Sequence, residues 1–267
     1  MKVSPELTYP HVVHHKTYPP SYCHVLRKQH GGIKPPEICA SLIEIYTDKS
    51  DHVLDPFAGV GSTLIAATIT GREAVGIDIN ENWRNIYHEV CKRENLEIQE
   101  YHVADSETQL DNLAEDNYFR LVLTDVPYWE MDKLVKTRGK FSKAGEPTRE
   151  KLPSSLKKFN TESPKEIPDW LALLENVFKV CKTKLEKNGY LVIFIGNMYR
   201  NVGTGKKKVG RYLPLSNLLA ERIRKLNYKQ LAEITWYSPD RKLGVYGYPF
   251  VYIPSIVDQR ILVFRND

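Results

Sequence analysis

The sequence predicts an α/β protein with a doubly wound, mostly parallel sheet of seven strands and an antiparallel hairpin near one edge. Short apolar runs alternate with segments of helical periodicity, and several of these runs end in aspartate. Strands that alternate with helices are typical of parallel sheets whose faces the helices cover. The last two apolar runs follow each other without a helix between them, which predicts the hairpin.

The first part of the expected sheet comes from two strands, each followed by a helix. DHVLDP (51–56) is an apolar run closed by Asp-Pro, and the glycines of FAGVGSTLIAATITG (57–71) lead into an amphipathic helix. REAVGIDIN (72–80) is a second run that ends in acid, and ENWRNIYHEVCKREN (81–95) places apolar residues at helical spacing. These segments predict parallel strands with helices packed beside them.

The later segments continue the alternation. LEIQEYHVAD (96–105) and YFRLVLTD (118–125) are expected strands that also end in Asp. The helix DWLALLENVFKVCKTKLEK (169–187) stops at Asn-Gly, and the strand YLVIFIGN (190–197) follows it. The remaining expected elements are a helix within 214–227 and strands within 228–238 and 260–266.

Composition indicates an ordinary globular protein. The 267 residues are 42% hydrophobic and 27% charged, and no run approaches the roughly 18 apolar residues that span a bilayer. The start, MKVSPELTYP, lacks a signal-peptide core. The four cysteines form no CxxC pair and the N-terminal histidines match no compact ligand set, so we expect a cytoplasmic protein without a metal site. The net charge of +5 permits a polyanionic partner without requiring one.

Four expected strands end in acid at the same rim of the sheet. Ligands of open parallel sheets bind beyond the carboxyl ends of the strands. One aspartate there is unremarkable because Asp favours turns. Four of them predict a binding site. They are Asp55, Asp78, Asp105 and Asp125.

The segment DPFAGVGST (55–63) has the glycines of a ligand-binding turn. Gly59 and Gly61 let the backbone turn tightly and a ligand approach closely. A dinucleotide loop would read GxGxxG, and here the third glycine is missing. Asp78 is placed to accept hydrogen bonds from ribose hydroxyls, and Asp105 could accept one from an adenine amine. This set favours a nucleoside without a phosphate, such as S-adenosylmethionine, over the alternative that AGVG is only a packing turn.

The segment TDVPYW (124–129) admits a structural and a chemical interpretation. Structurally, Pro ends strands and aromatic rings pack against the end of a sheet. Chemically, the Asp125 carboxylate and the Val126 carbonyl could accept both N–H groups of a base amine, with Pro127 holding them in place. Tyr128 would then stack on the base, which must leave the duplex. The rim shared with the cofactor segment favours the chemical interpretation.

Together these segments resemble the amino-methylating DNA methyltransferases, which make N4-methylcytosine or N6-methyladenine. DPFAGVGST resembles their cofactor motif, and TDVPYW their catalytic loop of Asp, Asn or Ser followed by Pro-Pro and an aromatic. HGGIKPPEICASLIEIYT (30–47) resembles the segment that closes over methionine. Later motifs follow in family order as GYLVIFIGN, LPLSNLLAERIRKLNY, LAEITWYS and YPFVYIPSIVDQRILVFR. Val126 departs from the pattern, because Pro is usual there; the carbonyl survives this change and the stiffness does not.

The resemblance implies one catalytic domain over residues 1–267, with a basic insertion at about 130–168 and no separate target-recognition domain. It implies methyl transfer from S-adenosylmethionine to cytosine N4 or adenine N6 of double-stranded DNA, with a cognate restriction endonuclease as a further partner. Thr124 and Trp129 match the cytosine subgroup. The residues that it assigns to the cofactor are Lys34, Pro35, Asp55, Phe57, Ala58, Gly59, Gly61, Asp78, Ile79 and Asp105.

Two polar segments are expected to bind nucleic acid, the insertion and GTGKKKVGR (203–211). Basic side chains suit phosphates, which position DNA without reading its sequence, although solvated loops have the same composition. The residues expected at DNA are Trp129, Lys133, Arg138, Lys206, Lys207, Lys208 and Arg211. Two alternatives stay open: an RNA amino-methyltransferase, and an impaired methyltransferase that only binds its ligands.

Overall fold

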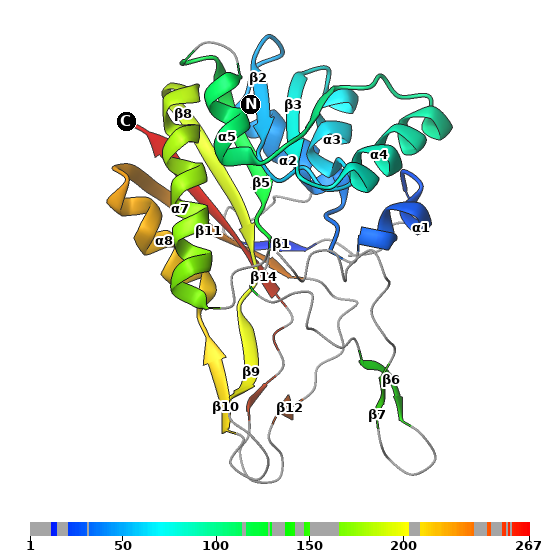
Figure 1. The fold of residues 1–267 in the computed structure, drawn as a ribbon, viewed down its shortest axis with the longest axis vertical. Helices are drawn as coiled ribbons and strands as arrows, with labels where there is room; N and C mark the ends of the chain where they lie inside the picture. The colour runs from blue at the N-terminus through cyan, green and yellow to red at the C-terminus, as the bar shows by residue number, and fades with distance from the viewer. Residues whose placement is uncertain are drawn as a thin grey trace.

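A computed structural model shows a single eight-stranded sheet with helices on both faces (Figure 1). The strand order is β1-β11-β14-β8-β5-β2-β3-β4. The backbone is described for residues 12–14, 21–30, 32–113, 116–127, 129, 137–141, 147–149, 166–202, 209–237, 245–246, 253–254, 256 and 258–267. The sheet strands are β1 (Val12–His14), β2 (His52–Asp55), β3 (Glu73–Asp78), β4 (Glu100–Val103), β5 (Phe119–Asp125), β8 (Leu185–Ile195), β11 (Tyr228–Tyr237) and β14 (Asp258–Asn266).

The expected fold is confirmed, with one additional strand. Strands β8, β5, β2, β3 and β4 pair in parallel, whereas β14 runs antiparallel to both of its neighbours, β8 and β11. The pair β11–β14 is the expected hairpin. The short β1, parallel to β11 at the sheet edge, is the eighth strand, which the sequence patterns did not predict.

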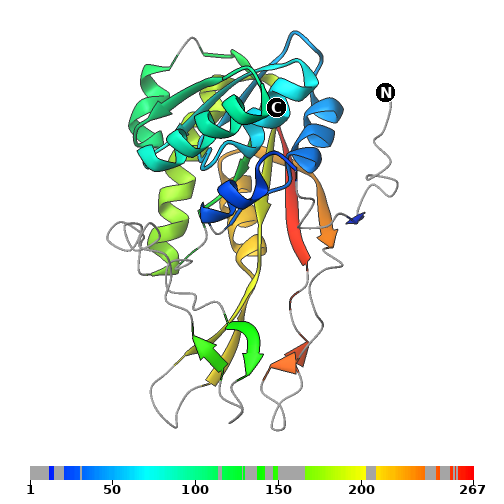
Figure 2. The same cartoon turned by 90° about the vertical axis from the view of Figure 1, so that its right-hand side faces the viewer.

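Two layers of helices bury the two faces of the sheet (Figure 2). One core lies under α5, α7 and α8, and the other under α2, α3 and α4. The helices are α1 (His24–Arg27), the 3₁₀ turn η2 (Lys28–His30), α2 (Pro36–Tyr46), α3 (Ser62–Thr70), α4 (Glu81–Glu94), α5 (Ser106–Asn112), α7 (Ile167–Lys184) and α8 (Leu215–Lys225). All of these except the short α1 and η2 bury apolar residues against the sheet, and this burial is what stabilises short helices.

Two element boundaries differ from the sequence expectation. Strand β4 ends at Val103, so Asp105 lies beyond it, where its side chain accepts hydrogen bonds from the amides of Glu107 and Thr108 and caps α5. Strand β8 begins at Leu185, within the segment expected to be helical. The Asn-Gly pair lies inside this strand, with Asn188 at φ +62°. Both differences arise because local hydrogen bonding, rather than periodicity, sets where an element ends.

Three small hairpins lie below the sheet in Figure 1, on the side toward which the parallel strands run. They are β6 (Thr137–Phe141) with β7 (Pro147–Arg149), β9 (Met198–Val202) with β10 (Val209–Leu213), and β12 (Val245–Tyr246) with β13 (Ile253–Pro254). Strand β9 follows β8 after two residues, so this hairpin leaves the carboxyl end of the sheet. The same end carries the acidic rim.

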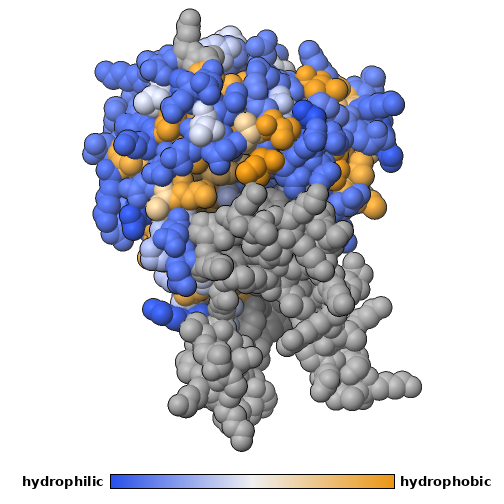
Figure 3. All heavy atoms as spheres, viewed as in Figure 1, coloured by the Kyte–Doolittle hydropathy of each residue, from blue (hydrophilic) through white to orange (hydrophobic). Residues whose placement is uncertain are grey.

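The described part of the surface seen in Figure 3 is mainly hydrophilic, with apolar residues in small scattered groups. Among the residues that the structure describes, no helix is both long and apolar enough to cross a bilayer.

Candidate active site

Three of the four predicted acids meet at the carboxyl ends of adjacent strands. Asp125, Asp55 and Asp78 are the last residues of β5, β2 and β3, which are neighbours in the sheet. A cleft enclosing about 370 Å³ of space not filled by atoms opens here. Asp55 and Asp125 line it, together with His30, Lys34 and Gly59. Phe194 of β8 lines it too, so the site is built from segments far apart in the sequence.

The glycine turn after β2 has the conformation that the sequence predicts. Gly59 and Gly61 have φ values of +50° and +75°, which L side chains rarely adopt. The Gly59 amide donates to Oδ2 of Asp78 at 2.9 Å, and its carbonyl accepts from the Tyr101 hydroxyl at 2.7 Å. A Cβ on Gly61 would lie 2.3 Å from the Tyr87 ring. Both glycines are thus required by the backbone.

Asp78 is a mostly buried carboxylate with an exposed apolar neighbour. Its side chain accepts from two backbone amides, those of Gly59 and Asn80, the latter also at 2.9 Å. Burial raises the pKa of Asp78 to about 6, and these two hydrogen bonds oppose the rise. The next residue, Ile79, is 51% exposed. An acceptor beside an exposed apolar side chain suits a ribose joined to a flat base.

Asp55 joins the ends of two strands. It is buried, and its Oδ1 accepts from the Thr124 hydroxyl at 2.6 Å and the Phe57 amide at 3.1 Å. Burial, the largest cause, raises its pKa to about 6. Because Thr124 directly precedes Asp125, this bond ties the cofactor turn to the end of β5.

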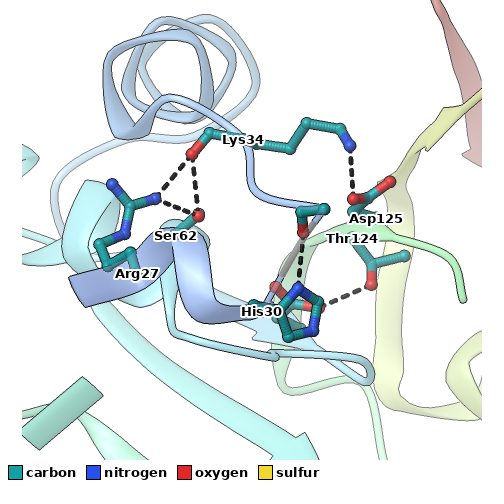
Figure 4. Close-up of polar contacts among 8 residues, drawn as sticks. Arg27, His30, Lys34, Ser62, Thr124 and Asp125 are labelled. Carbon is teal, nitrogen blue, oxygen red and sulfur yellow. Dashed lines mark hydrogen bonds and ion pairs between the residues drawn. The ribbon is translucent and has the colours of Figure 1, made fainter. Parts of the chain in front are cut away.

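Lys34 and Asp125 form an ion pair across the cleft (Figure 4). Lys34 lies just before α2, and its side chain extends to the end of β5. Its ammonium also lies 5.7 Å from the ring centroid of Phe194 and 5.9 Å from that of Trp236. The sequence patterns assigned Lys34 to the cofactor and gave no sign of this contact.

The loop after β5 is fixed by packing and by one hydrogen bond. The Val126 side chain is buried in the core under α7, and the Trp170 indole donates to the Pro127 carbonyl at 2.7 Å. Trp129 is also buried in this core, at 8% exposure. The structural interpretation of TDVPYW therefore accounts for Val126 and Trp129. Packing does not account for Asp125, which lines the cleft and agrees with the chemical interpretation.

Several expected site residues have no side-chain description. Tyr128, Lys133 and the lysines at 206–208 lie outside the described residues, and Arg138 is described only as backbone of β6. Arg211 is exposed on β10. The contact of Trp129 with DNA stays a prediction, and it would require the ring to leave the core. Within the described ranges, no group of three or more His, Cys, Asp or Glu is arranged to hold a metal.

Four residues that sequence reasoning missed support the site. Arg27, which is buried, and Ser62 both donate to the Lys34 carbonyl, at 2.7 and 2.9 Å. His30 packs over the glycine turn, with Nε2 3.1 Å from where a Cβ on Gly59 would lie. Trp170 holds the loop after β5. Arg27 lies seven positions before Lys34 but follows no recognisable motif, and the other three residues are far in sequence from their partners, so no local pattern could have revealed them.

The fold and the rim of acids define a class, the S-adenosylmethionine-dependent methyltransferases. TrmN from Thermus thermophilus has a similar fold, with a TM-score of 0.50 at 13% identity over 86% of this chain and 48% of that one. A sequence profile of the family described as DNA methylase matches residues 7–89 and 119–255, more than half of the chain. The chain therefore belongs to the DNA methylase family.

Two curated relatives match over short segments. The type II methyltransferase M.MthZI of Methanothermobacter thermautotrophicus is 39% identical over 61 residues, 23% of this chain and 17% of the relative. The tRNA (guanine(10)-N2)-dimethyltransferase of the same species is 34% identical over 101 residues, 36% of this chain and 28% of the relative. The matches thus span less than a third of the length of either relative.

The described residues fit S-adenosylmethionine, the cofactor of this class. The turn at Gly59 and Gly61 is buried and lacks the third glycine of a pyrophosphate loop. With the cofactor bound, Asp78 could accept hydrogen bonds from ribose hydroxyls, and Ile79 could present an apolar face to adenine. His30 and Lys34 border the same cleft. A carboxylate acceptor beside an apolar side chain suits a nucleoside.

We expect cofactor affinity to fall as the pH is lowered through about 6, the raised pKa of Asp78. Ribose hydroxyls donate to the ionised carboxylate, so binding favours the deprotonated form; affinity is constant above pH 6 and declines below it, by up to about tenfold per unit. Asp78→Asn should remove this dependence and weaken binding at pH 7.5 by about 1–3 kcal/mol. Calorimetric titration from pH 5 to 8 measures both. Asp111→Asn, exposed on α5, is the control, and an unchanged acid limb in Asp78→Asn contradicts this assignment.

We also expect Trp170→Phe to loosen the loop after β5. The phenyl ring is smaller than the indole and leaves part of the site empty, and the hydrogen bond to the Pro127 carbonyl is lost; together these lower the free energy of unfolding by about 2–4 kcal/mol. Tyr228→Phe is a matched control, since it removes a buried hydrogen bond of 3.1 Å to the Phe178 carbonyl of the same helix. Denaturant unfolding and methyl-transfer rates separate the two variants. Only Trp170→Phe should slow transfer, and equal rates would show that the bond serves stability alone.

Proposed function

We propose that this protein transfers a methyl group from S-adenosylmethionine to the exocyclic amine of a flipped base in double-stranded DNA. One observation carries the proposal: Asp125 ends β5 beside the cofactor turn, and the Thr124–Asp55 hydrogen bond joins the two segments. A carboxylate at this position faces the same cleft as the glycine turn. Acceptor and cofactor segments are therefore adjacent, as direct transfer requires.

The residues at the cleft suit an amine substrate. The nitrogen of a base amine is a poor nucleophile because its lone pair is delocalised into the ring. An ionised carboxylate only accepts hydrogen bonds, so Asp125 would hold one N–H and draw the nitrogen toward a tetrahedral form. The cofactor, when bound, supplies an electrophilic methyl group. The amine would gain that methyl as the methyl–sulfur bond breaks and its electron pair stays on sulfur, and the proton that the nitrogen loses would pass to water.

The backbone carbonyl of Val126 is the proposed second acceptor. The Pro127 carbonyl instead accepts a hydrogen bond from the Trp170 indole N–H, so the two carbonyls of the loop would have different partners. The usual proline at position 126 would stiffen this loop. Here burial of the Val126 side chain and the Trp170 hydrogen bond restrict it, which favours an active enzyme over an impaired binding module. Tyr128 is proposed to stack on the flipped base.

DNA is proposed to approach the carboxyl end of the sheet. The three hairpins lie on this side in Figures 1 and 2, and Arg211 is exposed on β10. Arg138, Lys133 and the lysines at 206–208 are proposed to contact phosphates, which would position the duplex. Sequence reading would then come from the insertion. A cognate restriction endonuclease belongs to the same proposal.

Transfer of labelled methyl to duplex DNA, compared with RNA, tests the function. We expect label in DNA and, after digestion, N4-methylcytosine by mass spectrometry, since Thr124 and Trp129 match the cytosine subgroup. N6-methyladenine alone would show that this choice of base is wrong. Label in RNA alone would support the alternative that the match to a tRNA methyltransferase raises. Cofactor binding without transfer to either nucleic acid would support the impaired module.

A further inference from the structure

The Lys34 side chain is held against Asp125 in a mostly buried setting. Its ammonium pairs with Oδ2 of Asp125, and the rings of Phe194 and Trp236 flank it. Only 4% of the Lys34 side chain and 19% of that of Asp125 are exposed. Burying an ammonium is costly unless it is paired and well oriented. The position of each charge therefore depends on the other.

The backbone of Lys34 is fixed independently of its side chain (Figure 4). The Lys34 carbonyl accepts from Arg27 Nη2 at 2.7 Å and from Ser62 Oγ at 2.9 Å, and Arg27 Nη2 also donates to Ser62 at 2.6 Å. Pro35 follows and restricts Lys34 to extended conformations. Burial lowers the pKa of Arg27 to about 10, so its guanidinium stays charged at neutral pH. The main chain from which the Lys34 side chain extends is therefore held in place.

The charges in the cleft favour a cation near Asp125. Asp55 is a second buried carboxylate, and the charge of Asp125 is among the causes that raise its pKa, after burial. The buried Cys39 thiol also faces this group of charges, and burial raises its pKa to about 12. Like charges and burial both favour the protonated form of a carboxyl, whereas a nearby ammonium favours the ionised form. A protonated Asp125 would have less capacity to accept an N–H from an amine.

We propose that Lys34 is a positioning residue whose ammonium fixes the orientation of the Asp125 carboxylate and keeps it ionised to accept a hydrogen bond from the target amine. This inference rests on the proposed function and moves Lys34 from the cofactor to the carboxylate. No bond to Lys34 forms or breaks, and its protons stay on the ammonium throughout. Arg27 and Ser62 act through it by holding its main chain.

Single-turnover methyl transfer with Lys34→Met tests the inference. Removing the charge should lower the rate about tenfold or more and move the acid limb of the rate profile about one unit to higher pH. Cofactor affinity, measured by calorimetry, should stay within about threefold of the wild-type value, because the Lys34 ammonium is proposed to contact Asp125 and not the cofactor. Lys34→Arg, which keeps a positive charge, should recover most of the rate. Lys49→Met, an exposed lysine in the turn before β2, is the control for loss of charge alone.

Other outcomes overturn the inference. An unchanged rate would mean that the pair only ties α2 to β5, and a faster rate would mean that Lys34 blocks the carboxylate. A loss confined to cofactor affinity would return Lys34 to the cofactor. If Lys34→Met does not fold, Lys34→Gln keeps a hydrogen-bond donor without the charge and is held to the same expectations.

The proposed function can fail separately. If the wild-type protein methylates no nucleic acid, carbon-13 NMR of the carboxyl groups still tests the pair, with the Asp125 signal assigned from Asp125→Asn. A titration midpoint that moves to higher pH in Lys34→Met supports the electrostatic part of the inference. A midpoint that does not move refutes it, whatever the substrate.

Discussion

Asp125→Ala should lower the rate of methyl transfer by at least about a hundredfold while cofactor affinity stays nearly unchanged, the usual effect of losing one preorganised polar group. The carboxylate lies at the end of β5, where it would accept a hydrogen bond from the target amine. The cofactor turn depends on Asp55 and Asp78 instead. Radioactive methyl transfer measures the rate, and calorimetry with S-adenosylhomocysteine measures binding.

The alanine variant also leaves the Lys34 ammonium without its carboxylate, which lowers stability by about 3–5 kcal/mol if the pair is fully buried and by less at 19% exposure of Asp125. Asp125→Asn is the matched variant, because its amide oxygen still accepts from Lys34. Asp125→Asn should keep part of the transfer rate that Asp125→Ala loses, because its amide oxygen can still accept an N–H from the target amine, and its thermal stability should be closer to that of the wild type. Parallel losses of rate, cofactor affinity and stability in both variants would instead support TDVPYW as a purely structural turn.

Gly61→Ala should destabilise the protein by about 2–5 kcal/mol, the sum of backbone strain at positive φ and forced repacking of a core side chain. Gly61 has φ +75°, and a Cβ there would lie 2.3 Å from the Tyr87 ring. That ring is fully buried and its hydroxyl accepts from the Gln99 amide at 2.9 Å, so it cannot move without loss. The cofactor turn should distort with it and reduce cofactor affinity.

Gly71→Ala separates the two contributions. Gly71 ends the same helix α3 at φ +69°, and a Cβ there meets nothing within 4 Å. Its cost should therefore be the backbone strain alone, about 1–2 kcal/mol, with cofactor affinity unchanged. Denaturant unfolding compares the two alanine variants. Equal costs would mean that the Tyr87 contact relaxes freely and that the turn is less constrained than its geometry indicates.

The sheet and the cofactor turn were predictable because their signals are local. Apolar runs ending in Asp55, Asp78 and Asp125 mark strand ends directly, and Gly59 and Gly61 mark a turn that only glycine adopts easily. Sequence order then places these strands side by side under the rules of parallel sheets. Asp105 shows the limit of such signals, since an aspartate after an apolar run also caps the next helix.

The supporting contacts were not predictable because they join distant segments. Lys34 and Asp125 are separated by 91 positions, and Trp170 and Pro127 by 43. Trp129 was expected at DNA because aromatic residues beside a catalytic loop can stack on bases, whereas the same ring can equally fill a core. Only tertiary packing distinguishes these outcomes, and it places Trp129 inside.

The hydrogen bond between Trp170 and Pro127 has a consequence for how proteins with this fold could diversify. The chain leaves the loop after β5 and returns at α7, and the bond holds these two points together. The chain between Pro127 and Trp170 therefore forms a loop whose two ends are joined by this hydrogen bond. The entropy of closing such a loop grows only with the logarithm of its length, about 0.6 kcal/mol for each doubling. Segments of very different length and sequence can therefore replace one another between Pro127 and Trp170 without moving Asp125 relative to the rest of the cleft.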